Sequence, residues 1–226
     1  MLILLFLTGG GYYFWTTREI TQPTTDPITQ PNPPVKQPPK PAFSSDTPNY
    51  LPLSTEGNTP EGMKTLHQRT GKEVIASGIT QPVEFFLADQ NNTRLSLTAF
   101  LSQSGITLPE SVTTTLSSDF SLFMINDQGQ ARIALAAIST NPEATKTALQ
   151  QTETNLFQIL SPLLPTTTTP ATNDSFKEAN YRGLSVRFLN FNPEQKLSID
   201  YTLIKNKLII ATSKDGGRAL MEKLLQ

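Results

Sequence analysis

The sequence predicts an α+β domain with a largely antiparallel sheet and helices packed on one face, preceded by an N-terminal membrane helix and a disordered Pro-rich linker. Strand patterns come mostly as neighbouring pairs joined by short turns, and helix patterns separate these pairs and end the chain. An apolar run and a cluster of prolines precede them. We therefore divide the chain into a membrane anchor over residues 1–16, a linker over 17–60 and an extracytoplasmic domain over 61–226.

The predicted anchor is the apolar, uncharged run over residues 2–15 (LILLFLTGGGYYFW). Its last four residues are aromatic, and Tyr and Trp favour the lipid–water boundary. The run is shorter than the roughly 20 apolar residues that a spanning helix needs, so we interpret it as a truncated transmembrane helix of the signal-anchor type. A signal peptide and a buried element are the alternatives. The signal peptide fits less well, because no basic residue precedes the run and bulky residues follow it.

The predicted linker carries most of the prolines. Residues 16–60 hold eleven of the eighteen, including PNPPVKQPPKP at 31–41, and large aliphatic residues are sparse there. Such a segment buries too little apolar surface to offset its ordering entropy, and clustered prolines favour an extended polyproline II conformation. We interpret it as a stalk. The PxxP spacings also allow a ligand for proline-reading domains.

The composition excludes several function classes. The chain has 18 Lys and Arg, 19 Asp and Glu, one His and no Cys. Nearly balanced charges predict no nucleic-acid partner. The absence of Cys excludes disulfides, thiolate metal sites and a Cys nucleophile.

The first half of the domain is expected to contain helices and one isolated strand. Thr59 is a candidate N-cap, and Pro60 suits the first position of a helix. The expected elements are a helix over 60–76, a strand over 81–88, and short helices over 95–103 and 108–116.

A hairpin and a long helix follow. Residues 119–126 and 131–139 are largely apolar strands around a Gly-containing turn, so the hairpin should lie inside the sheet. Asn141 and the following Pro-Glu then start an amphipathic helix of about twenty residues.

The last part of the sequence predicts three strands and a helix. The strands are expected over 181–191, 197–204 and 208–212, and the second alternates apolar residues with Ser198, Asp200 and Thr202. Ser213 is the candidate cap of the final helix, KDGGRALMEKLL. We expect Leu220, Leu224 and Leu225 of this helix to face the sheet, on the face that the long helix also covers.

These last elements carry a family resemblance. The stretch YRGLSVRFLNF followed by LSIDYTLIKNKLIIATSKDGGRALMEKLL, within residues 181–225, resembles the end of a family of uncharacterised single-pass membrane proteins of candidate-phylum (Patescibacteria-like) bacteria, a domain of unknown function. The shared signature is a strand that ends in an aromatic residue, SIDY, a turn, LIIATSK and a helix. The resemblance implies an extracytoplasmic C-terminal domain and no particular activity.

Motifs that could carry chemistry are weak. Thr70-Gly71-Lys72 lacks the other residues of a phosphate-binding loop. The segment 212–217 (TSKDGG) starts a helix and could bind an anion, but we interpret it as a capped helix entry. Asn91 and Asn173 begin glycosylation patterns that matter only in a eukaryotic secretory context.

Single titratable residues also give little evidence for a catalytic site. His67 is the only histidine, no G-x-S-x-G motif accompanies it, and we expect it at the surface or the boundary of the core. Asp200 and Glu194 are candidates for a carboxylate pair, but a cross-strand contact of Asp200 with Arg187 is the preferred interpretation. We therefore assign no catalytic, cofactor-binding or metal-binding residue, and we expect no cofactor.

The functional expectation is a membrane-tethered extracytoplasmic domain that acts as a non-enzymatic binding or envelope-assembly module. Its expected partners are the lipid bilayer, through residues 2–15, and an unidentified protein. The alternatives are a cell-envelope hydrolase that uses Asp200 or Ser213, and a subunit of a larger membrane complex.

Overall fold

The computed structural model describes residues 43, 49–52, 59–89, 93–165, 170–171 and 174–226. The chain divides into two units, Met1–Pro38 and Pro39–Gln226, and every described residue belongs to the second. The elements, in chain order, are β1 (Asn49–Pro52), α2 (Pro60–Ala76), β2 (Val83–Ala88), α3 (Leu97–Gln103), α4 (Glu110–Thr113), β3 (Leu116–Asp127), β4 (Gln130–Ser139), α5 (Pro142–Leu160), η2 (Ser161–Leu163), β5 (Lys177–Tyr181), β6 (Leu184–Asn192), β7 (Leu197–Ile204), β8 (Lys207–Ala211) and α6 (Lys214–Leu225).

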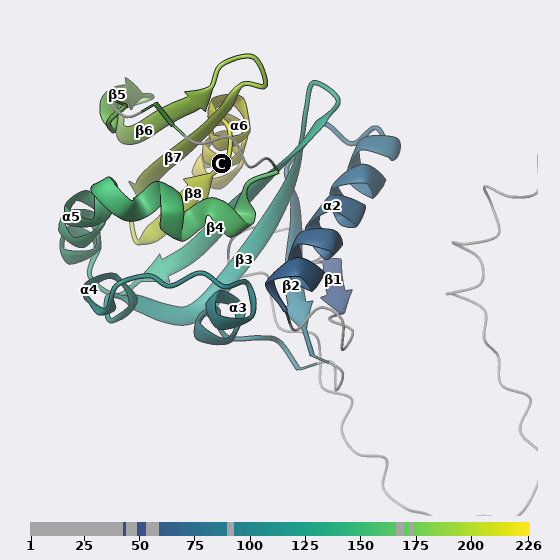
Figure 1. Ribbon diagram of the computed structural model, residues 1–226, viewed down its shortest axis with the longest axis horizontal. Coiled ribbons are helices and arrows are strands. Elements are labelled where there is room, and N and C mark those ends of the chain that lie inside the picture. The colour runs from purple at the N-terminus through teal and green to yellow at the C-terminus, as the bar shows by residue number, and fades with distance from the viewer. Residues whose placement is uncertain (1–42, 44–48, 53–58, 90–92, 166–169, 172–173) are drawn as a thin grey trace, which may run out of the picture. The chain divides into compact units, whose positions relative to one another are not determined.

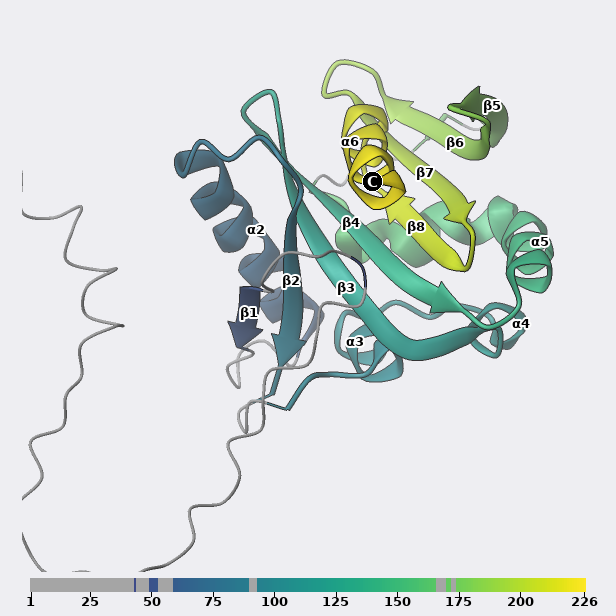
Figure 2. The same cartoon turned by 180° about the vertical axis from the view of Figure 1, so that it is seen from behind.

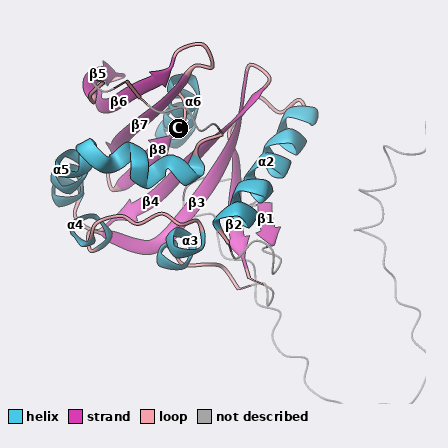
Figure 3. Ribbon diagram, in the orientation of Figure 1, coloured by secondary structure: helices cyan, strands magenta, loops and turns pink. Residues whose placement is uncertain are grey.

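All the described strands form one eight-stranded sheet in the order β1-β2-β3-β4-β8-β7-β6-β5. β1 and β2 are parallel, and all other neighbours are antiparallel. Figure 3 shows how the helices surround this sheet. The α+β class and the largely antiparallel sheet are therefore confirmed.

The prediction that the helices lie on one face is wrong. α2 and α5 cover the first face, which Figure 1 shows in front, whereas α6 covers the second face, which Figure 2 shows in front. The central strands explain this arrangement, because β4 presents Leu135 and Ala137 to the core of the first face and Ala134 and Ala136 to the core of the second. A sheet that is apolar on both sides needs a cover on both sides.

The predicted helix starts are confirmed at α2 and α5. Gly62 donates its backbone N–H to the Thr59 hydroxyl at 3.1 Å, and Ala144 donates its own to the Asn141 side chain at 3.2 Å. These side chains satisfy backbone donors that have no partner within the helix.

Residues 181–191 do not form a single strand. β5 and β6 form a hairpin instead, and Arg182 and Gly183 between them adopt φ angles of 51° and 82°. Two residues with positive φ make the tight turn that suits the twist of paired strands. Arg rarely adopts a positive φ, so Gly183 was the only residue in the sequence that indicated this turn.

Part of the predicted linker belongs to the folded unit. Asn49–Pro52 forms β1 at one edge of the sheet, and the Phe43 side chain is buried in the core of the second face. Lys207 reaches the Phe43 carbonyl with its ammonium group at 3.4 Å. The boundary at residue 61 is therefore too late. The predicted anchor and the remaining linker lie outside the described residues.

Candidate functional site

The start of α6 lies close against the sheet. Ser213 is fully buried, accepts the N–H of Gly216 at 3.1 Å and donates its hydroxyl hydrogen to Asp127 at 2.9 Å. A Cβ atom on Gly217 would lie 3.3 Å from the Cβ of Ala211 and 3.8 Å from the Cβ of Asp200. The glycines therefore let the first turn of α6 rest directly on β7 and β8, with Asp200 beneath it.

Beside this contact is a hollow of about 220 Å³, which we call the α6 hollow. α6 supplies one wall, on the second face of the sheet that Figure 2 shows. The residues that line the hollow are Ala179, Asn180 and Tyr181 of β5, Val186, Phe188 and Asn190 of β6, Asp200 of β7, and Lys214, Arg218 and Met221 of α6. The α6 residues share one side of the helix because they are four and three positions apart.

Asp200 is the most unusual residue of the α6 hollow. The residue is only 6% exposed, and its Oδ1 atom is closed off from solvent. Burial raises the pKa of Asp200 to about 6, and the Asp215 charge adds to this rise. A side-chain hydrogen bond from Ser198 and the positive charges of Lys214 and Arg218 act in the opposite direction and lower this pKa. A carboxyl group with a raised pKa is therefore held against the hollow, beside the Ser198 hydroxyl and the cations of Lys214 and Arg218.

The predicted contact of Asp200 with Arg187 is wrong. Asp200 lies opposite Phe188 and Ala211 in the sheet, whereas Arg187 lies opposite Tyr201. Adjacent residues of a strand point to opposite faces, so Arg187 is on the first face. There it donates two hydrogen bonds to Glu153 of α5, at 2.7 and 2.5 Å, and Tyr201 donates a third at 2.5 Å.

The rim of the α6 hollow is held by its own contacts. Tyr181 donates its hydroxyl hydrogen to Glu222 at 2.6 Å, and Arg182 donates to the same carboxylate oxygen at 2.9 Å. These contacts lower the pKa of Glu222. The Arg218 guanidinium carbon lies 4.8 Å from the centre of the Tyr181 ring, so this ring fixes the position of the cation.

The predicted orientation of α6 holds only in part. Leu220 is buried against the second face and Leu224 is partly buried, whereas Leu225 is 44% exposed. Gly216, Gly217 and Met221 are the other buried positions. Gly217, Leu220, Met221 and the partly buried Leu224 form the side of α6 that faces the sheet, and Leu225 stands at the exposed end of the helix.

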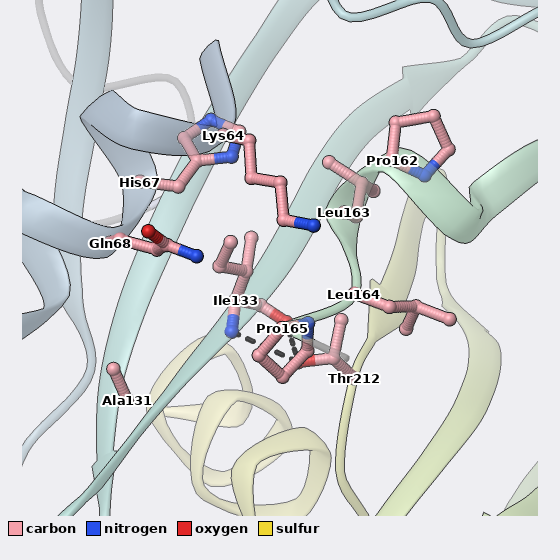
Figure 4. A pocket seen from close by; sticks show the side chains of 10 residues that line it. All are labelled: Lys64, His67, Gln68, Ala131, Ile133, Pro162, Leu163, Leu164, Pro165 and Thr212. Atoms are coloured by element: carbon pink, nitrogen blue, oxygen red, sulfur yellow. Dashed lines mark hydrogen bonds between the residues drawn. The ribbon is translucent and has the colours of Figure 1, made fainter. Parts of the chain in front are cut away.

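His67 lies in a second, smaller cavity on the first face, and its predicted surface position is wrong. This cavity of about 50 Å³ lies between α2, η2 and β4. Figure 4 shows His67, Lys64 and Gln68 of α2 on one side and Leu163 and Pro165 on the other. His67 is 4% exposed, and neither ring nitrogen has a hydrogen-bond partner among the described residues. Desolvation lowers its pKa to about 4, so the ring is neutral and packs as an apolar group.

The other sequence motifs do not form sites. Gly71 lies inside α2, where an added Cβ would lie 2.5 Å from the Cβ of Ala131, so this glycine serves close helix–sheet packing. Glu194 is exposed in the turn after β6, away from the α6 hollow. Asn91 and Asn173 lie outside the described residues. Ser213 serves as the helix cap that was predicted for it.

Sequence reasoning missed that Lys214, Arg218 and Tyr181 line the same hollow as Asp200. The three- and four-residue spacing of Lys214, Arg218 and Met221 could have indicated that they share one side of a helix and form one wall of a hollow. The hairpin of β5 and β6 supplies the rest, and its turn was not recognised.

In the part of the chain that the structure describes, no group of three or more His, Cys, Asp or Glu residues could hold a metal ion. No helix of that part is long and apolar enough to cross a membrane. No family model, curated protein or solved structure matches the chain.

Proposed function

We propose that this protein is a non-enzymatic binding module, tethered to a cell membrane and displayed outside the cytoplasm, and that it binds a small polar ligand in the α6 hollow. The observation that carries the proposal is the buried Asp200 carboxyl, which lines the hollow together with the cations of Lys214 and Arg218. Burying an ionised carboxyl group costs folding free energy, and a ligand that donates hydrogen bonds to it offsets part of that cost.

The site also argues against the alternative of a hydrolase that uses Ser213. The Ser213 hydroxyl is buried, caps α6 and donates to Asp127, so it is not free to attack a substrate. Asp200 has no second carboxylate beside it in the α6 hollow. The usual two-carboxylate arrangement of glycoside hydrolysis is therefore not formed by the residues that line this hollow.

The proposed tether rests on the sequence. Residues 2–15 are apolar and uncharged, and residues 16–60 carry eleven of the eighteen prolines. The resemblance of residues 181–225 to single-pass membrane proteins of candidate-phylum bacteria supports the same layout, with the bilayer and an unidentified protein as partners. Fractionation of cells that express the full chain tests it: we expect the protein in the membrane fraction, and a chain without residues 1–16 in the soluble fraction. A full chain that is entirely soluble contradicts the tether.

The binding proposal is tested with a panel of small molecules. Amino acids, amines, carboxylates and sugars are titrated into the full chain, in detergent where needed, and followed by NMR. We expect at least one class to shift the resonances of residues that line the α6 hollow, and the shifts to weaken in Asp200→Asn. Asp215→Asn is the matched control, because Asp215 is the neighbouring acid but does not line the hollow. A panel that leaves these resonances unchanged contradicts the binding function.

A further inference from the structure

We propose that the ligand of the α6 hollow is a small zwitterion with an ammonium group, a carboxylate and an apolar side chain, as in a neutral aliphatic α-amino acid. This inference rests on the proposed binding function and specifies its ligand. It follows from three features of the hollow: a buried carboxylate, a pair of cations and an apolar floor.

The buried carboxylate selects an ammonium group. Asp200 is nine-tenths buried and lines the hollow. Asn190, which lies on the same face of the sheet as Asp200, also lines the hollow. An ammonium offers three N–H donors and a positive charge, so it can donate to the Asp200 carboxylate and stabilise its ionised form. A neutral hydroxyl donor would supply only the hydrogen bond.

The cation pair selects a carboxylate. Lys214 and Arg218 project from the same side of α6 into the lining of the hollow, and both influence the Asp200 carboxyl electrostatically. Two cations and one buried acid leave a net positive charge among the lining residues. A ligand that carries only an ammonium would add to this excess, whereas a zwitterion places its carboxylate against Lys214 and Arg218.

The remaining lining restricts the size and the side chain. Val186, Phe188 and Met221 supply apolar surface. The volume of about 220 Å³ is below the roughly 300–1,000 Å³ that is typical of sites for drug-sized ligands. A sugar would favour open aromatic faces, but the guanidinium of Arg218 already lies over the Tyr181 ring, which leaves Phe188 as the second aromatic ring of the lining. A side chain about as large as that of leucine fits this surface better.

The test compares L-leucine with two analogues by calorimetric titration of the full chain. N-acetyl-L-leucine lacks the ammonium charge, and L-leucinamide lacks the carboxylate. We expect L-leucine to bind and each analogue to bind at least tenfold more weakly. We also expect Asp200→Asn to bind L-leucine at least tenfold more weakly, but to bind N-acetyl-L-leucine almost as the unchanged protein does. Likewise, Arg218→Gln should bind L-leucine more weakly but leave the affinity for L-leucinamide almost unchanged. Asp215→Asn and Arg69→Gln are the controls, because neither residue lines the hollow and Arg69 is exposed on α2.

The outcomes separate the ligand class from the proposed function. An analogue that binds as tightly as L-leucine, or equal losses in the control variants, overturns the zwitterion. Binding of a sugar in the α6 hollow without binding of L-leucine also overturns it, but leaves the binding function standing. If no compound of the wider panel binds in the hollow, both proposals fail. Thermal unfolding of each variant shows whether a loss of binding reflects a loss of the fold.

Discussion

Acidification should destabilise the folded domain through His67. The folded-state pKa of about 4 lies below the ordinary value of 6.5, because the ring is desolvated. Between these two pH values the unfolded chain binds more protons than the folded chain, so stability falls as the pH falls through this window. Above pH 6.5 and below pH 4 this contribution is constant.

The size of the effect follows from the shift. Each pKa unit corresponds to about 1.4 kcal/mol, so the drop from 6.5 to about 4 removes about 3 kcal/mol of unfolding free energy. His67→Leu keeps an apolar side chain of similar size and removes the titrating group. The free energy of unfolding in urea, measured for both proteins at pH 7 and pH 4, isolates the contribution of His67 from that of the carboxylates.

We expect the wild-type protein to lose about 3 kcal/mol more than His67→Leu between these pH values. Because His67 is the only histidine, its ring signal can also be followed without ambiguity by NMR. A ring that titrates near pH 6.5 in the folded protein, or equal losses in both proteins, would refute the account of a desolvated, neutral His67.

Three further substitutions test the packing and the electrostatics. Asp200→Asn should stabilise the protein at pH 7.5 by up to about 3 kcal/mol, because the pKa of Asp200 is raised from 3.8 to about 6 in the folded state. The ionised carboxylate therefore destabilises the fold above pH 6, and this destabilisation decreases as the pH falls. Gly71→Ala should lower the unfolding free energy by about 1 kcal/mol or more, since the new Cβ would collide with Ala131. Glu153→Gln should cost about 1–3 kcal/mol, because it weakens the hydrogen bonds from Arg187 and Tyr201. Urea unfolding measures all three.

Each of these substitutions has a matched control. Asp215→Asn removes a neighbouring charge that lies outside the α6 hollow, and Lys72→Ala changes an exposed position beside Gly71. Glu178→Gln changes the exposed acid that lies 3.8 Å from Arg187. Exposed substitutions usually change stability by less than about 0.5 kcal/mol. Controls that cost as much as the test variants would show that the assigned contacts do not carry the effect.

Local signals in the sequence predicted the elements well. The caps at Thr59, Asn141 and Ser213 fixed the starts of α2, α5 and α6, because a side-chain acceptor that precedes a helical pattern has few other interpretations. The alternation of Ser198, Asp200 and Thr202 with apolar residues likewise predicted which side chains of β7 share a face. Both kinds of signal depend only on neighbours along the chain.

Contacts between elements that are distant in the sequence could not be predicted from these local signals. The sequence did not show that α5 and α6 cover opposite faces, since either helix could cover either side of a sheet with two apolar faces. It paired Asp200 with Arg187, because a strand pattern does not establish the register between strands. The candidate site depends on that register, on the β5–β6 turn at Arg182 and on the close approach at Gly217.

The titration of Asp200 itself tests the binding account most directly. Carbon NMR of the Asp side chains, with Asp200→Asn for assignment, gives the pKa of this carboxyl in the free protein and with saturating L-leucine. The account predicts a pKa of about 6 without ligand, from burial, and a lower pKa with L-leucine, because a bound ammonium favours the ionised form. An ordinary pKa near 4 in the free protein, or a pKa that L-leucine leaves unchanged, would contradict it.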